Sequence, residues 1–220
     1  MLDAIKVTYH YTASPYIASQ WLQSLPPTVA LDFETANKYD PDEITEYKRL
    51  AALKCTAPSV ARICRQRANA TGLSHPSLTR ITHMSLAISQ SEAYVFLFEQ
   101  KKMEDLLMHW LITTDIHQVW WNAAFDFKLI YYRTRKFPAH FDDGQLLAKT
   151  LVNHVEVFKA KTGLKDVAGG HFGSWGISAD YFDTSQMRNE VVLLYSATDS
   201  CATLWAWDRM QKHLKGEQDG

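Results

Sequence analysis

Alternation between apolar and polar positions marks the first hundred residues as a series of strands with one short helix. Residues 5–11 alternate and are rich in β-formers, which predicts a strand. A serine–proline pair at 14–15 signals the start of an amphipathic helix, and two prolines at 26–27 stop it. Residues 28–35 read as a further strand. Residues 81–89 and 93–98 predict two strands joined as a hairpin.

Helical spacing of apolar residues dominates the second half of the chain, where two short strands interrupt it. The strands expected there are residues 118–121 and 140–143. The expected helices are residues 103–111, 122–135, 145–152, 164–172 and 189–214. Strands that come early and helices that interleave with them later predict an α/β domain built on a mixed sheet.

Residues 37–78 break this rhythm and form the most basic part of the chain. The cations there include Lys48, Arg49, Lys54, Arg62, Arg65 and Arg67. An Asp-Pro-Asp-Glu sequence at 40–43 opens a helical stretch. Such a charge run is usually a solvated helix face. Its position directly after the strand at 28–35 leaves a second interpretation open, namely an insertion that contacts nucleic acid.

Composition sets outer limits on these interpretations. A chain of 220 residues that is 46% hydrophobic can bury the core of one domain, and we expect a single domain over residues 1–220. No apolar run approaches the 18 or more residues that span a bilayer, and three cysteines without a C-x-x-C pair fit reduced thiols. The expected protein is therefore soluble and intracellular, in the cytoplasm. A net charge of −1 gives no overall positive charge of the kind that indicates nucleic-acid binding. A nuclease with a local basic rim is still compatible with it.

The strand at 28–35 carries the first candidate chemistry. Side chains alternate along a strand, so Asp32 and Glu34 share one face while Leu31 and Phe33 share the other. Two carboxylates this close repel each other unless a cation lies between them. Oxygen ligands of this kind suit magnesium or manganese.

Two further acidic positions follow in helical contexts. Asp126 lies about one turn into the helix that begins at Asn122, where its side chain can turn back toward the end of the sheet. Tyr195 and Asp199 are four residues apart in the last helix and so point the same way. An aspartate near a helix N-terminus often only stabilises the helix dipole, and a tyrosine four residues before an aspartate is common. The ordered conjunction with Asp32 is what makes these acids candidate ligands.

These three stretches resemble the motifs of a known nuclease superfamily. ALDFET (30–35), WNAAFDFKLI (121–130) and YSATDSCATLW (195–205) resemble the Exo I, Exo II and Exo III motifs of DnaQ-like (DEDDy) 3′-5′ exonucleases. FDDGQLLAKTL (141–151) and TGLKDVAGGHFG (162–173) resemble accessory elements of RNase D and of family A DNA polymerase proofreading domains. The resemblance implies a ribonuclease H-like fold, with a mixed five-stranded sheet flanked by helices and a helical insertion after the first core strand.

The resemblance also implies a two-metal hydrolysis. One divalent ion, Mg²⁺ or Mn²⁺, would activate a water, and the other would stabilise the leaving 3′-oxygen. Tyr195 would orient or help deprotonate the attacking water. The implied metal ligands are Asp32, Glu34, Asp126 and Asp199.

Substrate contacts are implied for Thr35, Asn122, Phe125 and Lys165. Asn122 would lie near the terminal nucleotide, the backbone of Thr35 would approach the substrate, and Lys165 would touch a phosphate unless it is simply a solvated helix lysine. The chain departs from the family after Asp143, because Gly144 stands where many members have threonine. Asp142 and Asp143 compete for that position. We interpret Asp143 as a supporting or structural residue and not as a ligand.

The sequence thus favours a metal-dependent 3′-5′ exonuclease that prefers the 3′ end of single-stranded DNA. With no polymerase domain following, it would act alone or proofread in trans beside a DNA polymerase that lacks its own exonuclease during DNA replication. The alternative within the enzyme class is a 3′-5′ exoribonuclease acting on RNA or short oligoribonucleotides. A non-catalytic nucleic-acid-binding module is the second alternative, and the presence of all four acids and the tyrosine argues against it.

Overall fold

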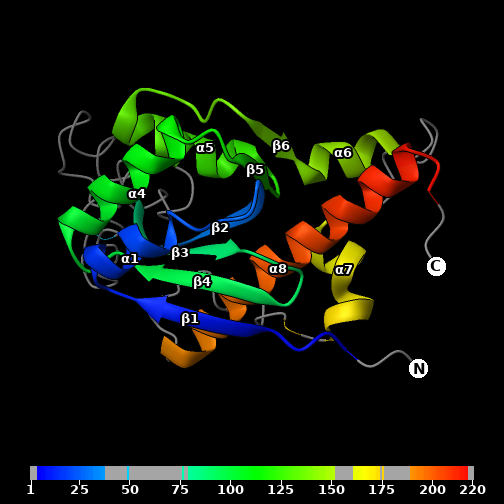
Figure 1. Ribbon diagram of the computed structural model, residues 1–220, viewed down its shortest axis with the longest axis horizontal. Coiled ribbons are helices and arrows are strands. Elements are labelled where there is room, and N and C mark those ends of the chain that lie inside the picture. Colours follow the sequence, from blue (N-terminus) through cyan, green and yellow to red (C-terminus); the bar gives the residue numbers. More distant parts are fainter. Residues whose placement is uncertain are drawn as a thin grey trace.

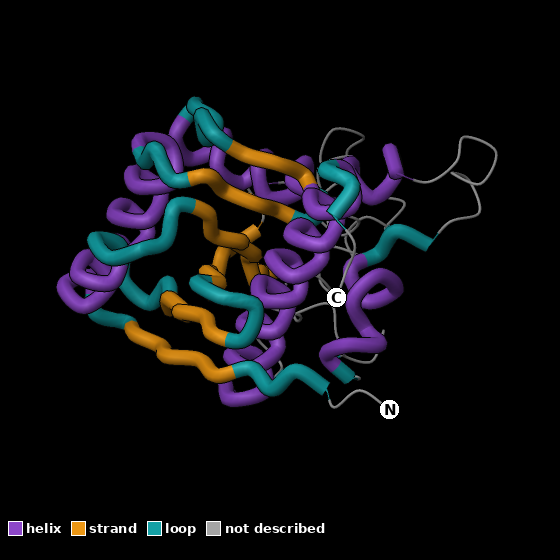
Figure 2. The backbone as a smooth tube through the Cα atoms, turned by 45° about the vertical axis from the view of Figure 1, so that its right-hand side comes forward, coloured by secondary structure: helices purple, strands orange, loops and turns teal. Residues whose placement is uncertain are grey.

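A six-stranded mixed sheet lies between two layers of helices in the computed structural model (Figures 1 and 2). The structure describes residues 4–37, 49, 76, 79–151, 161–173, 175 and 189–217. Nearly all of the predicted basic insertion at 37–78 lies outside these residues. None of the described helices is long and apolar enough to cross a membrane.

Strand β2, which carries the predicted acids, lies inside the sheet, whose order is β1-β4-β3-β2-β5-β6. It runs antiparallel to β3 and parallel to β5. The β3–β4 hairpin is antiparallel, and β1 and β6 extend the two edges as parallel strands. The strands are β1 (Thr8–Thr12), β2 (Thr28–Asn37), β3 (Thr79–Ala87), β4 (Glu92–Leu97), β5 (His117–Trp120) and β6 (Phe141–Asp143). The predicted α/β fold class is confirmed, with six strands where the resemblance implied five.

Six helices whose bounds lie in the described part of the chain divide between the two faces of the sheet. Three of them cover one face: α1 (Pro15–Trp21), α4 (Lys101–Thr113) and α5 (Ala123–Thr134). The other three cover the opposite face: α6 (Gly144–Leu151), α7 (Leu164–Phe172) and α8 (Asn189–Leu214). Figure 2 shows the strands between these two helical layers, with α8 running alongside the sheet.

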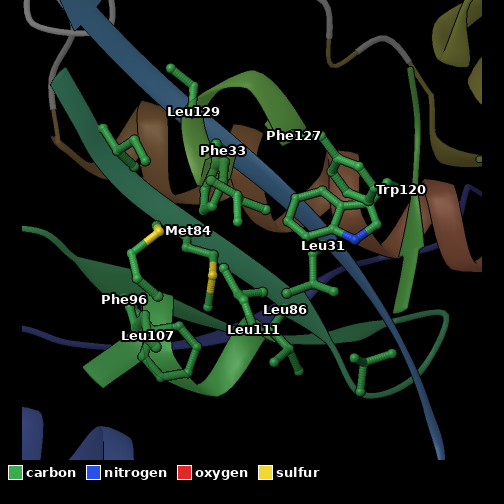
Figure 3. Close-up of a cluster of buried hydrophobic side chains, with 14 of the residues drawn as sticks. Leu31, Phe33, Met84, Leu86, Phe96, Leu107, Leu111, Trp120, Phe127 and Leu129 are labelled. Carbon is green, nitrogen blue, oxygen red and sulfur yellow. The ribbon is translucent and has the colours of Figure 1, made fainter. Parts of the chain in front are cut away.

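The face under α1, α4 and α5 holds the larger hydrophobic core. Leu31 and Phe33 point into it from β2, as the alternation predicted, and both are almost fully buried. Figure 3 shows these two side chains beside Met84 and Trp120. Phe33 packs at a tilted angle on Trp120, with ring centroids 5.4 Å apart. Large side chains therefore fill the space between this face and its helices.

The face under α8 is lined by small residues. Ala30, Ala87 and Ala93 lie on the sheet, and Ala197 and Cys201 meet them from the helix. All five are completely buried. Because small side chains let a helix backbone approach a sheet closely, they bring polar groups of α8 within reach of β2.

Two predicted boundaries near the start of the chain were wrong. The first strand begins at Thr8 and not at residue 5, since its partner β4 begins at Glu92, opposite Thr8. The N–H of Ile5 instead donates to the carbonyl of His171 at 2.7 Å. Helix α1 ends at Trp21 and does not reach Leu25. Pro26 disfavours helical backbone at Leu25, so the helix does not include that residue.

Candidate active site

Strand β2 presents Asp32 and Glu34 to helix α8, opposite the face that Leu31 and Phe33 occupy. Asp199 comes from α8 to meet them. One ligand oxygen from each of the three carboxylates lies within 4.8 Å of the other two. The structure therefore brings together three of the four predicted metal ligands in one cluster.

Helix α8 places Tyr195 and Asp199 on its sheet-facing side, one turn apart. The hydroxyl of Ser85 on β3, opposite Asp32, donates to the carbonyl of Ser196 at 2.7 Å, and both serines are completely buried. This bond ties the start of the Exo III-like motif to the sheet. The predicted i, i+4 geometry of Tyr195 and Asp199 is confirmed, because Lys165 contacts both side chains at once.

Asp126, the fourth predicted ligand, lies in the first turn of α5 and is only 3% exposed. Burial, and next the negative charge of Asp32, raise the pKa of its carboxyl. It is not one of the three residues whose ligand oxygens cluster. The N-cap residue of α5 is Asn122, which has left-handed backbone (φ 60°, ψ 49°), a conformation that asparagine tolerates well. This tight entry lets the helix start directly after β5.

Asp143 fixes that entry by capping two helices. One carboxylate oxygen accepts from the backbone N–H groups of Asn122, Gln145 and Leu146 at 3.1, 2.9 and 3.2 Å, and the other accepts from Ala123 at 3.0 Å. Helix N-termini leave such donors unpaired, and a carboxylate there is favourable. The structural interpretation of Asp143 is confirmed.

Asp142 points elsewhere. Its Oδ2 accepts from the indole N–H of Trp207 at 2.7 Å and lies 3.2 Å from Nε2 of His117. Asp142 thus joins β6 to α8 and β5, and the competition between the two aspartates is resolved: Asp143 supports the Exo II-like turn, and Asp142 supports packing at the edge of the sheet.

Burial raises the pKa of all four carboxyls, and repulsion by a neighbouring carboxylate raises the pKa of Asp32, Glu34 and Asp126 further. Burial is the largest cause for each of them. The negative charge of Asp199 further raises the pKa of Asp32, and that of Asp32 further raises the pKa of Glu34. Asp32 and Glu34 also share a hydrogen bond. A divalent cation bound between carboxyls with raised pKa values would favour their ionised form and so displace their protons.

Two buried carboxylate oxygens at this site lack a hydrogen-bond partner among the described residues: Oε1 of Glu34 and Oδ1 of Asp126. A buried acceptor without a donor is costly, and hard oxygen atoms are the ligands that Mg²⁺ and Mn²⁺ take. The donor set therefore fits divalent cations of that class. Asp32, Glu34 and Asp199 would hold one ion, and the pair Asp32 and Asp126 offers ligands for another.

Lys165 enters the site from α7, with its side chain 42% exposed. Its ammonium donates to the hydroxyl of Tyr195 at 2.7 Å and to both oxygens of Asp199 at 3.4 Å. It is therefore not the freely solvated helix lysine that the sequence left open. Its positive charge lowers the pKa of Asp199, which burial raises, and burial together with Asp199 raises the pKa of Tyr195.

Trp175 is a site residue that the sequence reasoning missed. Its indole N–H donates to Oδ1 of Asp199, and Lys165 lies 5.7 Å from the centre of its ring. The pairing had no signal in the sequence, since the tryptophan and the aspartate are 24 residues apart and no spacing rule relates them.

The remaining predicted substrate contacts take three different positions. Thr35 is buried. It directly follows the register shift that lies between Glu34 and Thr35 in β2. Asn122 is exposed at the N-terminus of α5. Phe125 is partly buried and packs against the larger core. Their contacts with substrate stay predictions.

Comparison with solved structures gives the fold its relatives. No protein-family model matches the sequence, and no curated protein matches it significantly. Brucella melitensis NrnC with bound Mg²⁺ is similar over 96% of this chain and 83% of its own, at 15% identity and a TM-score of 0.59. Trypanosoma brucei RNase D in complex with RNA U12 is similar over 94% of this chain and 63% of its own, at 15% identity and a TM-score of 0.60.

Escherichia coli RNase D, an exoribonuclease involved in structured RNA processing, is similar over 96% of this chain and 46% of its own, at 10% identity and a TM-score of 0.60. The identities are low, so the likeness concerns the fold. The chain has the ribonuclease H-like fold of the DEDDy exonucleases, the superfamily that its three motifs resemble.

Proposed function

We propose that this protein is a metal-dependent 3′-5′ exonuclease that removes nucleotides from the 3′ end of RNA, including short oligoribonucleotides. The observation that carries the proposal is the buried cluster of Asp32, Glu34 and Asp199, whose ligand oxygens lie within 4.8 Å of one another. Asp126 stands beside it with an unpartnered oxygen. Such a cluster on this fold is costly to maintain without cations.

Divalent cations held by these carboxylates, two in our proposal, would supply an activated water and stabilise the leaving 3′-oxygen. The chain's own residues do the rest. Tyr195 lies against the cluster and keeps its proton, since the pKa of its hydroxyl is raised, so it orients the attacking water as a neutral hydrogen-bonding group.

Lys165 would contact the phosphate group whose ester bond is cleaved. Its ammonium is 2.7 Å from the Tyr195 hydroxyl, beside the place where the attacking water would lie. A flexible lysine can leave Asp199 for a phosphate oxygen as substrate enters, because both partners are anions. Trp175 keeps its own hydrogen bond to Asp199 and so holds that carboxylate in place.

RNA replaces single-stranded DNA as the preferred substrate in this proposal. One similar structure is NrnC bound to pGG, and another is RNase D in complex with RNA U12. These relatives fit the exoribonuclease alternative better than the DNA preference that the motifs suggested. They give no support to DNA replication, to proofreading or to a polymerase partner.

The test uses RNA and DNA oligonucleotides of matched sequence, labelled at the 5′ end, and a labelled dinucleotide. Each is incubated with the protein and Mg²⁺ or Mn²⁺, with EDTA and Asp199→Asn as controls. We expect a metal-dependent ladder that shortens from the 3′ end, faster on RNA. A faster DNA ladder would restore the DNA preference, and no metal-dependent product from any substrate would refute the proposed activity.

A further inference from the structure

The stretch from Phe127 to Phe141, which links the Exo II-like helix to strand β6, is strongly basic. It contains four cations, Lys128, Arg133, Arg135 and Lys136, and no acidic residue. The whole chain has a net charge of −1. This stretch forms the outer turns of α5 and the connection that runs along the top of Figure 1. The stretch is therefore positively charged, whereas the rest of the chain is negatively charged overall.

Large aromatic side chains are exposed on the same stretch. Tyr131 and Tyr132 are each 43% exposed and Phe137 is 54% exposed. The rings of Tyr131 and Phe137 stack with centroids 4.9 Å apart and planes 17° apart. Phe137 also lies 6.0 Å from the buried Phe127, which anchors the stack to the core.

Arg135 is held over these rings by the end of the helix. It has left-handed backbone (φ 59°), and its N–H donates to the carbonyl of Tyr131 at 2.8 Å. Its guanidinium lies 5.9 Å from the ring centre of Tyr131 and 5.6 Å from that of Tyr132. Arg133 is different, because it is paired with Glu104 at 2.6 Å and is not available to a ligand. Lys128, Arg135 and Lys136 are exposed, and Arg135 and Lys136 directly precede Phe137 in the chain.

We propose that Tyr131, Tyr132, Arg135, Lys136 and Phe137, here called the aromatic–basic platform, bind the body of a single-stranded nucleic acid whose 3′ end lies in the active site. Exposed rings interleaved with cations are the combination that binds single strands, since bases stack on the rings and phosphates pair with the cations. A protein partner would be favoured by an apolar patch with a mixed-charge rim, and this stretch has no acid.

The platform and the active site share one helix. Asp126 faces the cluster from the first turn of α5, and Tyr131 follows five residues later, about 8 Å further along the axis. A dinucleotide in the active site would not extend to the outer side of the helix, whereas a longer strand can. The platform should therefore matter for long substrates only. This inference rests on the proposed function.

The experiment measures two quantities on each variant. Binding of a labelled 12-nucleotide RNA is measured in EDTA, where cleavage is blocked, and hydrolysis of a labelled dinucleotide is measured with Mg²⁺. Tyr131→Ala/Tyr132→Ala removes rings, and Arg135→Ala/Lys136→Ala removes charge. Tyr16→Ala and Lys6→Ala/Lys215→Ala are matched controls, because these side chains are exposed and lie on α1 and near the chain ends.

We expect each platform variant to bind the 12-mer about tenfold or more weakly, with dinucleotide hydrolysis and both controls unchanged within about twofold. The charge variant removes two cations, so the salt slope of its binding should fall by about 1.4, at about 0.7 for each phosphate that is no longer neutralised. Unchanged 12-mer affinity in both platform variants would overturn the inference, as would a shift in oligomeric state by size-exclusion chromatography as their only effect. Wild-type protein that hydrolyses nothing would instead refute the proposed function.

Discussion

The two faces of the sheet differ in what they bury, and strand β2 shows the contrast within four consecutive residues. Leu31 and Phe33 pack into the large core under α1, α4 and α5. Asp32 and Glu34 face α8, where they meet Asp199. One face gains stability from apolar burial, and the other holds carboxyls whose pKa is raised by that same burial.

The contrast teaches that the larger core supports the strained site. Four carboxyls close together oppose folding when they are ionised, so the structure needs a rigid strand on their far side. Leu31 and Phe33 supply it by fixing β2 against Trp120 and its neighbours (Figure 3). Substitutions on the two faces of β2 and its partners should therefore have opposite effects on activity and on stability.

Removing one carboxylate from the cluster should have the largest effect. Asp199→Asn is expected to lower hydrolysis at least about 10³-fold, because one of the three clustered carboxylates that would hold a cation is lost. The same change removes a buried negative charge, so the melting temperature in EDTA should stay level or rise by a few degrees. Kinetics and calorimetry on one sample check both parts. A variant that keeps substantial activity would show that Asp199 is not a ligand.

Leu31→Ala breaks the opposite face of the same strand. Leu31 is 1% exposed, and truncating such a side chain creates a cavity that costs about 3 kcal/mol of unfolding free energy. Urea denaturation at constant slope should show this loss. Activity per folded molecule should fall far less than in Asp199→Asn. If Leu31→Ala instead inactivates the protein without destabilising it, the two faces are not separable.

The local geometry of the site was predictable because it follows short-range rules. Alternation along β2 put Asp32 and Glu34 on one face, and the four-residue spacing put Tyr195 and Asp199 on one side of α8. The strand-to-helix junction placed Asp126 in a first turn. Each of these depends only on neighbouring residues, and each is what the structure shows.

Interactions made by packing between distant elements were not predictable. Lys165 and Tyr195 are 30 residues apart, and only the packing of α7 against α8 brings them together. The start of β1 depends on where β4 begins, which no property of residues 5–11 reveals. The basic composition of the α5–β6 stretch is readable in the sequence, but its outward direction needs the orientation of α5.

Asp143→Ala tests whether one carboxylate holds the starts of α5 and α6, which lie on opposite faces of the sheet. The variant removes the acceptor for four backbone N–H groups, at the starts of α5 and α6, which should cost about 2 kcal/mol of stability. Asp126 shares α5 with that cap, so activity should fall as well. Asp142→Ala is the matched control, since it removes only the interactions with Trp207 and His117 and should leave catalysis nearly unchanged. Equal activity losses in both variants would contradict this division of roles.

The smallest expected effect is a pH dependence that only the α8 face should produce. A carboxyl whose pKa is raised on folding binds more protons in the folded state, so stability falls as pH rises from its ordinary pKa, about 4, to the raised value. His83 acts in the opposite sense: burial lowers its pKa to about 4, so its contribution rises with pH up to about 6.5.

Comparing wild type with Asp32→Asn cancels the histidine contribution. In EDTA, the wild type should lose stability relative to this variant as pH rises above about 4, measured by urea denaturation. Mg²⁺ should remove the difference, because cations favour the ionised carboxylates that the metal-free fold disfavours. A difference that is flat with pH in EDTA would mean that Asp32 ionises as easily in the folded protein as in the unfolded chain, and that the face under α8 carries no such strain.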